Sequence, residues 1–586
     1  MKTSHVRFFI LFPFLFILPS CGLIDSRESV TSDTVAPDKK SILVAPVQCP
    51  PLAETNNCAL KNADQSASGL WIFGDVLSGD FVYRNGGIQI DGSGRIQDVG
   101  CISAPEGAAV LSCPDHVVSP GLINPHDHLS YNQNFPGGQN AGTTPTNPDY
   151  YFCNDPQNAF SSEVCKGYRY DRRNEWRKGL EGKPAITAPW GGEDQAVAWN
   201  ELRHVMAGAT SVAGSGGMTG LVRNPDVAYL MEGLVTKDKH VDYDTFPLGD
   251  TSDVAGLDFG NCKYPKVADS SVLDNLIFLP HVAEGINEFA QNELYCLTGS
   301  GNGSVALQAP NSTFIHSVAA NPGNANTVKQ AGMTLVWSPR SNLSLYGNTA
   351  QAAMYDNMGI TIALSSDWTP SGSINMLREM SCAADFNSTY LNDHFSKQAL
   401  WKMVTINAAH ALGIDDQTGL LMKGYWADIA IYNTIGKSYT SYYDPIIYSD
   451  VGDVSLVLRA GKPLYGNQVV AQALDSSCEL INSVCGTAKA VCVKETGYSF
   501  AELQNFNQNS YPLYSCGVPS GEPSCIPARY GEYSGNVTVA DADGDGIKNT
   551  ADNCPNTFNP IRPMDSGKQA DYNSNGIGDA CDTSPL

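Results

Sequence analysis

Two apolar runs that lead into a pair of histidines constrain the fold of this chain more than any other feature. Val117 and Val118 precede the turn Ser119-Pro120-Gly121, a second run follows at Leu122 and Ile123, and the histidines are His126 and His128. Side chains at i and i+2 of an extended segment share a face, so both rings can reach one metal ion. A His-x-His pair arises easily by chance among ten histidines. Its place after a short buried strand is nevertheless typical of the active face of an α/β barrel.

Short segments in which apolar and polar residues alternate flank a long region with a different sequence pattern. Within residues 70–118, and again within 425–463, the alternation and the intervening Gly and Asp residues indicate strands of an antiparallel sheet. Between these flanks, apolar strands at 211–213, 276–279, 313–315, 334–337 and 360–364 alternate with helix-like stretches, as in parallel βα units. We therefore predict an α/β chain. Its (β/α)8 TIM-like barrel covers residues 120–409, and 68–119 and 410–470 form a composite β-sandwich around it.

Polar residues that could face one common mouth follow three of the later strands. His281 follows an apolar run and has Glu284 three residues on, His316 ends another strand, and Asp367 follows a fourth apolar run. A lone His after a strand is usually a structural hydrogen-bonding group. Because these groups recur at successive strand ends, we predict that they share one site.

The ensemble of motifs resembles the amidohydrolase superfamily over about residues 70–470. Besides the strand that ends in His126 and His128, it includes Gly208-Ala209-Thr210-Ser211-Val212, Ser338-Pro339-Arg340-Ser341-Asn342 and Gly424-Tyr425-Trp426-Ala427-Asp428-Ile429. Within the superfamily, His281 and Glu284 resemble the His-x-x-Glu of the mononuclear-metal deaminases and imidazolonepropionase-like hydrolases.

The resemblance implies a catalytic metal site. His126, His128, His281 and Asp367 would bind one divalent metal, most simply zinc, with iron or manganese as alternatives. The metal would lower the pKa of a water molecule towards about 7, and Asp367 would accept its proton. Glu284 would pass a proton to the nitrogen, and His316 would orient the hydroxide or stabilise the oxyanion.

The place of the nearest lysines and two departures from the family pattern bear on the reaction. The nearest candidates for the bridging lysine of binuclear members, Lys237 and Lys239, lie in a polar stretch, which favours a single metal. Trp337 and Trp368 stand where many deaminase-like members have His and Gly, and we expect both to alter the pocket wall. Metal-assisted hydrolysis is therefore expected, and ring deamination, lactam or amide hydrolysis and dipeptide-like cleavage remain open.

An insertion at residues 131–200 interrupts the first βα unit and should help to shape the substrate site. Two segments within it, Tyr170-Asp171-Arg172-Arg173 and Trp176-Arg177, either recognise an anionic or planar substrate or form a solvated helix face.

The N-terminus is typical of an exported lipoprotein. Residues 1–20 combine a basic start with an apolar block too short to span a bilayer, and Leu18-Pro19-Ser20-Cys21 resembles a bacterial lipobox. We expect lipid on Cys21, a tether over 21–67, and a place in the cell envelope at the outer membrane; an ordinary signal peptide cut nearby is the alternative. The net charge of −24 argues against binding to nucleic acid.

Cysteine usage supports export. Seventeen cysteines less Cys21 leave an even number, which suits disulfides in an oxidising compartment. The close pairs Cys49/Cys58, Cys101/Cys113 and Cys153/Cys165 are plausible bridges, although connectivity does not follow from sequence. Cys382, within the predicted barrel, could be free and buried.

The C-terminal region has two parts. Residues 471–539 are Cys-rich and irregular, and we expect a disulfide-stapled linker. Residues 540–586 hold two segments with calcium-loop spacing and resemble a thrombospondin type 3 repeat, in which Cys554 would pair with Cys581; an acidic disordered tail is the alternative. The candidate calcium ligands are Asp541, Asp543, Asp545 and Asp552 in the first loop, and Asp571, Asn573, Asn575 and Asp582 in the second.

Two functional hypotheses follow. The first is an exported, metal-dependent hydrolase that cleaves a non-peptide carbon–nitrogen bond in a small molecule. The second is a non-catalytic, calcium-dependent cell-surface binding protein that uses the barrel as a scaffold.

Overall fold

A computed structural model describes residues 45–52, 57–138, 147–235, 240–242, 245–249, 259–265 and 268–586. The expected signal segment, Cys21, Lys237 and Lys239 lie outside these ranges. Among the helices in the described ranges, none is long and apolar enough to cross a membrane.

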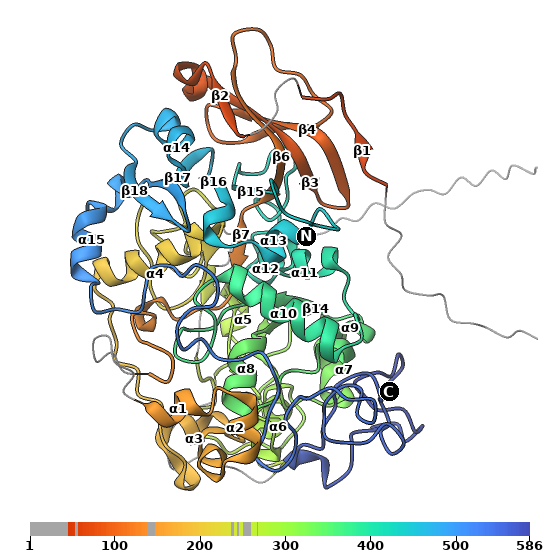
Figure 1. Cartoon of the computed structure of the whole chain (residues 1–586). Helices are drawn as coiled ribbons and strands as arrows, with labels where there is room; N and C mark the ends of the chain where they lie inside the picture. Colours follow the sequence, from red (N-terminus) through yellow and green to blue (C-terminus); the bar gives the residue numbers. More distant parts are fainter. Residues whose placement is uncertain are drawn as a thin grey trace, which may run out of the picture. The chain divides into compact units, whose positions relative to one another are not determined.

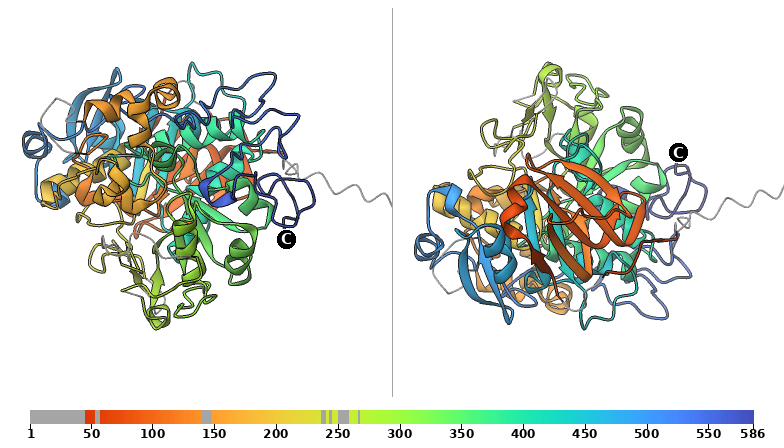
Figure 2. Two further views of the ribbon diagram at one scale, coloured as in Figure 1. Left: turned by 90° about the horizontal axis from the view of Figure 1, so that it is seen from below. Right: turned by 90° about the horizontal axis from the view of Figure 1, so that it is seen from above.

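One sheet of eleven strands joins the two flanks of the chain. Its strands are β1 (Val47–Gln48), β2 (Ala59–Lys61), β3 (Gly69–Ser78), β4 (Phe81–Asp91), β5 (Ile96–Gly100), β6 (Ala109–Pro120), β15 (Ile429–Asn433), β16 (Val454–Arg459), β17 (Lys462–Asn467), β18 (Glu479–Val484) and β19 (Thr487–Val491). The main order is β1-β4-β3-β6-β15-β16-β17-β19-β18, with β2 on β6 and β5 on β4. The flanks meet where β6 runs antiparallel to β15, with Pro120 opposite Ile429. Figures 1 and 2 show the N-terminal strands of this sheet side by side with those from the C-terminal flank.

The sheet reaches beyond the ranges expected for it. The predicted sandwich is one connected sheet, and β1 and β2 belong to the stretch expected to be a tether. Strands β18 and β19 belong to the stretch expected to be an irregular linker. The barrel boundary expected at residue 409 falls inside α12 (Ile406–Ala411), which packs with the barrel strands, since Ala408 and Ala411 share their buried cluster. Long-range strand pairing therefore recruits segments whose own sequence is too short or too polar to indicate a strand.

Eight disulfides pair all sixteen cysteines that follow Cys21. The predicted bridges Cys153–Cys165 and Cys554–Cys581 are present. The pairs Cys49/Cys58 and Cys101/Cys113 are wrong, because Ala59 lies opposite Ser112 in the β2–β6 register and this places Cys58 beside Cys113. Cys382 is bonded to Cys525 and is not free. The remaining bridges are Cys49–Cys101, Cys262–Cys296, Cys478–Cys492 and Cys485–Cys516.

The segment between the flanks is a TIM-like barrel of parallel strands. Described barrel strands are β7 (Leu122–Asn124), β8 (Ala209–Val212), β9 (His240–Asp242), β10 (Leu276–Phe278), β11 (His281–Val282), β12 (Thr313–His316), β13 (Thr334–Trp337) and β14 (Thr361–Leu364). Parallel pairing links β7 to β8, β9 to β10, and β11 through β14 in order, and a bridge between Asp127 and Asp367 joins the ends of β7 and β14. The strands predicted at 211–213, 276–279, 313–315, 334–337 and 360–364 are confirmed. Helices that follow the strands include α4 (Asp194–Met206), α6 (Glu288–Leu297), α7 (Pro322–Gln330), α8 (Pro339–Tyr346), α9 (Ala352–Asn357), α10 (Met376–Tyr390) and α11 (Lys397–Met403).

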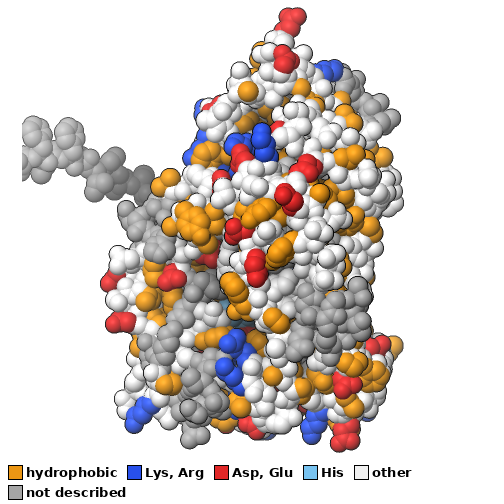
Figure 3. All heavy atoms as spheres, turned by 90° about the vertical axis from the view of Figure 1, so that its left-hand side faces the viewer, with side chains coloured by type: hydrophobic (Ala, Val, Ile, Leu, Met, Phe, Trp, Pro, Cys, Tyr) orange, Lys and Arg blue, Asp and Glu red, His pale blue; other side chains and the backbone are white. Residues whose placement is uncertain are grey.

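After β19 the chain forms α15 (Phe500–Phe506), which lies against α4, and then runs irregularly to the C-terminus. This last segment packs on the barrel helices: Phe558 contacts the rings of Phe386 and Tyr390, and the Tyr390 hydroxyl donates to the carbonyl of Gly535. On the face of the molecule in Figure 3, basic side chains form small groups separated by acidic and uncharged ones.

Candidate active site

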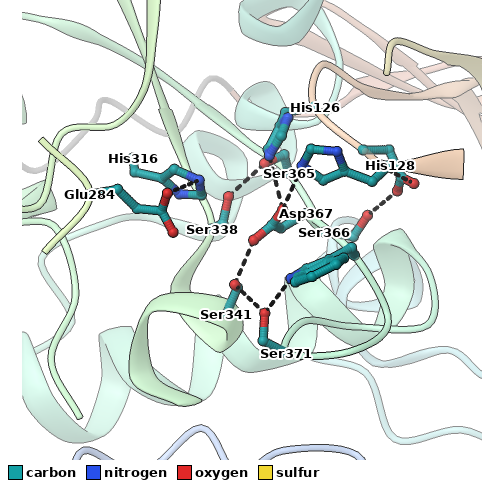
Figure 4. A network of polar contacts seen from close by, with 12 residues as sticks. His126, His128, Glu284, His316, Ser338, Ser341, Ser365, Ser366, Asp367 and Ser371 are labelled. Atoms are coloured by element: carbon teal, nitrogen blue, oxygen red, sulfur yellow. Dashed lines mark hydrogen bonds and ion pairs between the residues drawn. The ribbon is translucent and has the colours of Figure 1, made fainter. Parts of the chain in front are cut away.

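The carboxyl ends of the barrel strands bring the predicted metal ligands together, and Figure 4 shows three of them, His126, His128 and Asp367. His126 and His128 follow β7, His281 begins β11, and Asp367 follows β14. Ligand-type atoms of the three histidines all lie within 4.8 Å of one another. His126 Nε2 and His128 Nε2 are 3.0 and 3.4 Å from Asp367 Oδ1. Because parallel strands end on one face of a barrel, residues 241 positions apart in sequence meet here.

The protonation states of His281 and Asp367 suit a divalent metal. Burial lowers the pKa of His281 well below its ordinary value, so its imidazole is neutral and can donate a lone pair. Burial by itself would raise the pKa of Asp367, but hydrogen bonds with His126 and His128 outweigh it and hold the pKa well below the usual range. Neutral imidazoles and an ionised carboxylate are the forms that bind metal. The four residues therefore fit a divalent ion such as zinc.

Two of the predicted residues leave their strands with a left-handed backbone. His316 has φ 70° and Asp367 has φ 60°, a region that residues other than glycine rarely occupy. Such conformations cluster at functional sites, where the surrounding structure holds them. Sequence patterns gave no signal of this strain.

Glu284 lies beside the ligand cluster and is fully enclosed. Its Oε1 accepts a hydrogen bond of 2.8 Å from the Tyr346 hydroxyl, and its Oε2 lies 3.9 Å from His316 Nε2 and 3.8 Å from Arg173 Nη1. Burial raises the pKa of Glu284 to about 8, with Arg173 opposing the rise. The carboxyl is therefore protonated at neutral pH and can donate a proton.

His316 is held as a neutral ring in a defined tautomer. Burial lowers its pKa to about 3. The amide nitrogen of Asn342 lies 3.3 Å from His316 Nδ1, and because an amide nitrogen only donates, Nδ1 accepts and Nε2 carries the proton. The N–H of His316 is consequently available to an oxygen that gains negative charge.

A layer of polar residues supports the ligands, and most of it was missed by the sequence analysis. Ser341, within the recognised motif, donates to Asp367 Oδ2 at 2.5 Å. Asp127, the central residue of the His-x-His pair, accepts 2.8 Å hydrogen bonds from Asn124 and Ser366 and lies 3.1 Å from His204. Asp127 thus ties the end of β7 to the end of β14. Its position between two ligands was the one available signal.

The site opens into a cavity of about 550 Å³. Its aromatic walls include Trp176 and Trp368, whose ring centroids are 5.6 Å apart, and Arg177 lies 4.1 Å from the Phe246 ring. Trp176 and Arg177 belong to α3 (Arg173–Lys178), so the insertion does shape the pocket, and the solvated helix face is wrong because Trp176 is buried.

The two tryptophans flagged by the sequence have different places. Trp368 lines the cavity as expected. Trp337 does not: it is buried against Phe386 and Phe395, and its indole nitrogen donates to Thr349. Its expected effect on the pocket wall is therefore wrong, because β13 directs this side chain into the helical layer.

The two C-terminal loops are each closed by the same type of hydrogen bond, from a glycine N–H to the first aspartate of the loop. Gly546 N donates to Asp541 Oδ2 at 3.0 Å, and Gly576 N donates to Asp571 Oδ2 at 2.9 Å; both glycines have φ 89°, which fits the sharp turn at the sixth loop position. The carboxylates of Asp541, Asp543 and Asp545 lie within 4.8 Å of one another. In the second loop, Asn573 and Asn575 donate to Asp582 Oδ2 at 3.2 and 2.8 Å.

The first loop concentrates acidic groups out of contact with water. Asp543 is fully buried, and its Oδ2 has no hydrogen-bond partner, as is true of Asp552 Oδ2. Burial, reinforced by the charges of Asp545 and Asp552, raises the pKa of Asp543 to about 8.

Two family models match the chain. The amidohydrolase family matches residues 286–464, and the thrombospondin type 3 repeat matches residues 535–562. The 5-methylthioadenosine/S-adenosylhomocysteine deaminase of Teredinibacter turnerae is 28% identical over 190 residues, which cover 31% of this chain and 42% of that protein. Residues 286–464 of the chain are therefore similar to the amidohydrolase family. The amidohydrolase match includes His316 and Asp367, and it begins just after Glu284.

Another curated relative and two solved structures also resemble part of the chain. The 5'-deoxyadenosine deaminase of Methanothermobacter thermautotrophicus is 29% identical over 167 residues, covering 27% of this chain and 39% of that protein. The chain thus spans about two fifths of the length of these relatives. Among solved structures, an adenosine deaminase from Xanthomonas campestris with bound zinc has a TM-score of 0.45 at 15% identity, covering 71% of this chain and 93% of that one. An atrazine chlorohydrolase from Arthrobacter aurescens complexed with zinc has a TM-score of 0.45 at 18% identity, covering 67% and 95%.

Proposed function

We propose that this amidohydrolase hydrolyses a non-peptide carbon–nitrogen bond in a small molecule that carries a planar ring. The convergence of His126, His128, His281 and Asp367 beside a protonated Glu284 carries the proposal. A cavity of about 550 Å³ is of the size that small-molecule sites have.

The four ligand-type residues would hold one divalent metal, most simply zinc, with iron or manganese as alternatives. When bound, such a metal supplies a Lewis acid that makes a hydrolytic water acidic near neutral pH. Lys237 and Lys239, the candidates for a second-metal bridge, lie outside the described residues.

The protein groups divide the proton transfers between them. Asp367 is ionised and can take a proton from the attacking water. Glu284, with a pKa of about 8, can give its proton to the nitrogen as the carbon–nitrogen bond breaks. The Nε2–H of His316 can donate to the oxygen that gains charge on the substrate carbon.

Deamination of a purine-like ring is the first candidate within this class. Curated relatives are named as deaminases of 5-methylthioadenosine, S-adenosylhomocysteine and 5'-deoxyadenosine. Trp176 and Trp368 offer aromatic surfaces on which a planar ring can stack. Hydrolysis of a cyclic amide or amidine, and dipeptide-like cleavage, use the same groups and are the alternatives.

Export and calcium binding complete the proposal. Lipid on Cys21 would anchor the enzyme in the bacterial cell envelope, at the outer membrane, and sixteen paired cysteines suit that oxidising compartment. Calcium would occupy the C-terminal loops, since Asp543 keeps a buried oxygen without a hydrogen-bond partner beside two other carboxylates.

The test combines metal content with turnover. The chain from residue 22 is purified without a tag, its metals are measured by elemental analysis, and ammonia release is followed over a panel of adenosine-type nucleosides and cyclic amides. We expect about one zinc, iron or manganese per chain, lost in His281→Ala. Glu284→Gln should keep the metal and lose turnover by at least about 100-fold.

Other outcomes change the proposal. Two such metals per chain would indicate a binuclear site. Calcium alone, with no turnover, would overturn the hydrolase and favour the calcium-dependent cell-surface binding protein.

A further inference from the structure

One arginine of the C-terminal segment reaches the wall of the active site. Arg529 lies between the stretches matched by the two families, at residues 286–464 and 535–562, and its side chain is buried. Its Nη1 donates to the backbone carbonyls of Tyr346 at 2.8 Å and Tyr170 at 3.2 Å, and its Nη2 donates to Asp171 Oδ1 at 2.7 Å. The guanidinium thus joins two segments that lie far apart in sequence, one at residues 170–171 and one at residue 346.

The segment that contains Tyr346 is hydrogen-bonded to the proposed proton donor, Glu284. Tyr346 is the last residue of α8, where a cation is favoured by the helix dipole. Its hydroxyl donates to Glu284 Oε1 at 2.8 Å and accepts from Trp176 Nε1 at 2.9 Å. A shift at the end of α8 would therefore move the hydrogen bond that orients the Glu284 carboxyl.

The second segment surrounds the same carboxyl from the other side. The backbone N–H of Ile286 donates to the carbonyl of Asp171, and that of Arg173 donates to the carbonyl of Glu284. Trp176 of the same insertion lines the cavity. The insertion, α8 and the turn after β11 consequently meet at Glu284, and Arg529 bonds to the first two.

We propose that Arg529 is a positioning residue of the active site, supplied by the C-terminal segment. Within the described residues, its side-chain hydrogen bonds and ion pairs go to Tyr170, Asp171, Tyr346 and Glu532, none of which lines the cavity or is a proposed metal ligand. Arg529 acts by holding Tyr346 and the insertion against Glu284. This inference rests on the proposed function, because it assigns Glu284 the role of proton donor.

Kinetics test the inference through non-additivity. Arg529→Met should lower kcat by about 10- to 100-fold, since misplacement by about 1 Å has effects of this size, and should change KM by less than about 3-fold. Tyr346→Phe should have a similar effect on kcat. Because Arg529 acts partly through the Tyr346 hydroxyl, the double variant should lose less kcat than the product of the two single losses.

Arg459→Met is the matched control. Arg459 is also buried and ion-paired, 3.2 Å from Glu232 and 3.4 Å from Glu495, but it belongs to β16 of the sheet. This variant should lose stability and keep its kcat. If Arg529→Met does not fold, Arg529→Lys, which keeps the charge but cannot span both carbonyls, should lower kcat by about 5- to 10-fold.

A second readout needs no substrate. Hydrogen exchange of the backbone amides in residues 340–347 and 170–177 should speed up in Arg529→Met and stay unchanged in Arg459→Met. Unaltered exchange, a wild-type kcat in folded Arg529→Met, or multiplicative effects of the two substitutions would each overturn the inference. Absence of turnover in the wild type, with faster exchange in Arg529→Met, would instead refute the proposed function alone.

Discussion

Arg173 should control the pH range over which the enzyme works. Its side chain is buried, with Nη1 3.8 Å from Glu284 Oε2 and Nη2 2.5 Å from Glu293 Oε1. The positive charge favours the carboxylate form of Glu284 and so opposes the rise in its pKa that burial causes. Removing this charge in Arg173→Met must raise the pKa of Glu284 further.

The size of the effect follows from the distance. Two unit charges about 4 Å apart interact by about 4 kcal/mol at an effective dielectric constant of about 20. Since each pKa unit corresponds to about 1.4 kcal/mol, the upper limit of the rise is about 3. Glu293, deprived of its partner, acts in the same direction because its negative charge also disfavours ionisation of Glu284.

The assay is the pH dependence of kcat/KM. A proton donor must be protonated, so the wild-type rate should fall above about pH 8, the pKa of Glu284. In Arg173→Met this alkaline limb should move up by about 1 to 3 pH units, and the maximum rate should drop because the site is less well ordered. Arg173→Lys keeps the charge and should leave the limb within about 0.5 pH units of wild type. A folded Arg173→Met variant with an unmoved limb would refute the reasoning.

Two further predictions concern stability. Replacing the Cys382–Cys525 pair, 143 residues apart, with serines should lower the free energy of unfolding by about 5 kcal/mol. Replacing Cys153–Cys165, 12 residues apart, should lower it by about 3 kcal/mol, because the longer loop restricts the unfolded chain more. Equal losses in urea denaturation would contradict this account. Asp543→Asn should raise the Tm without calcium, since burial and the neighbouring carboxylates hold the Asp543 carboxyl protonated in the folded state whereas the unfolded chain ionises it, and should abolish the rise in Tm that calcium produces in the wild type. A calcium-dependent rise in Tm of wild-type size in Asp543→Asn would show that the first loop is not the stabilising site.

The sequence was sufficient to predict the barrel strands and the ligand set for a local physical reason. A short apolar run buries itself, and the polar residue that follows it must face the mouth where parallel strands end. His126, His128, His281 and Asp367 each carry that pattern within about ten residues, so their convergence required no knowledge of packing. The spacing of acidic residues and glycine in the C-terminal loops is local in the same sense.

Pairing across the chain was decided only by the tertiary structure. The β2–β6 register places Cys58 beside Cys113, and no spacing rule distinguishes this from the pairs first considered. Strands such as β1 and β18 form because a neighbouring edge accepts their hydrogen bonds, since β1 is too short to show a period and β18 does not alternate apolar and polar residues.

The surroundings of Glu284 show the same division. Glu284 was recognisable from its spacing to His281, but its pKa depends on burial and on Arg173 and Tyr346, which come from the insertion and from α8. Arg529 reaches this region from the C-terminal segment. The identity of the ligands follows from local sequence, whereas desolvation and charge compensation depend on which distant segments the fold packs around a group. The pKa of the Glu284 carboxyl could therefore be decided only by the folded structure.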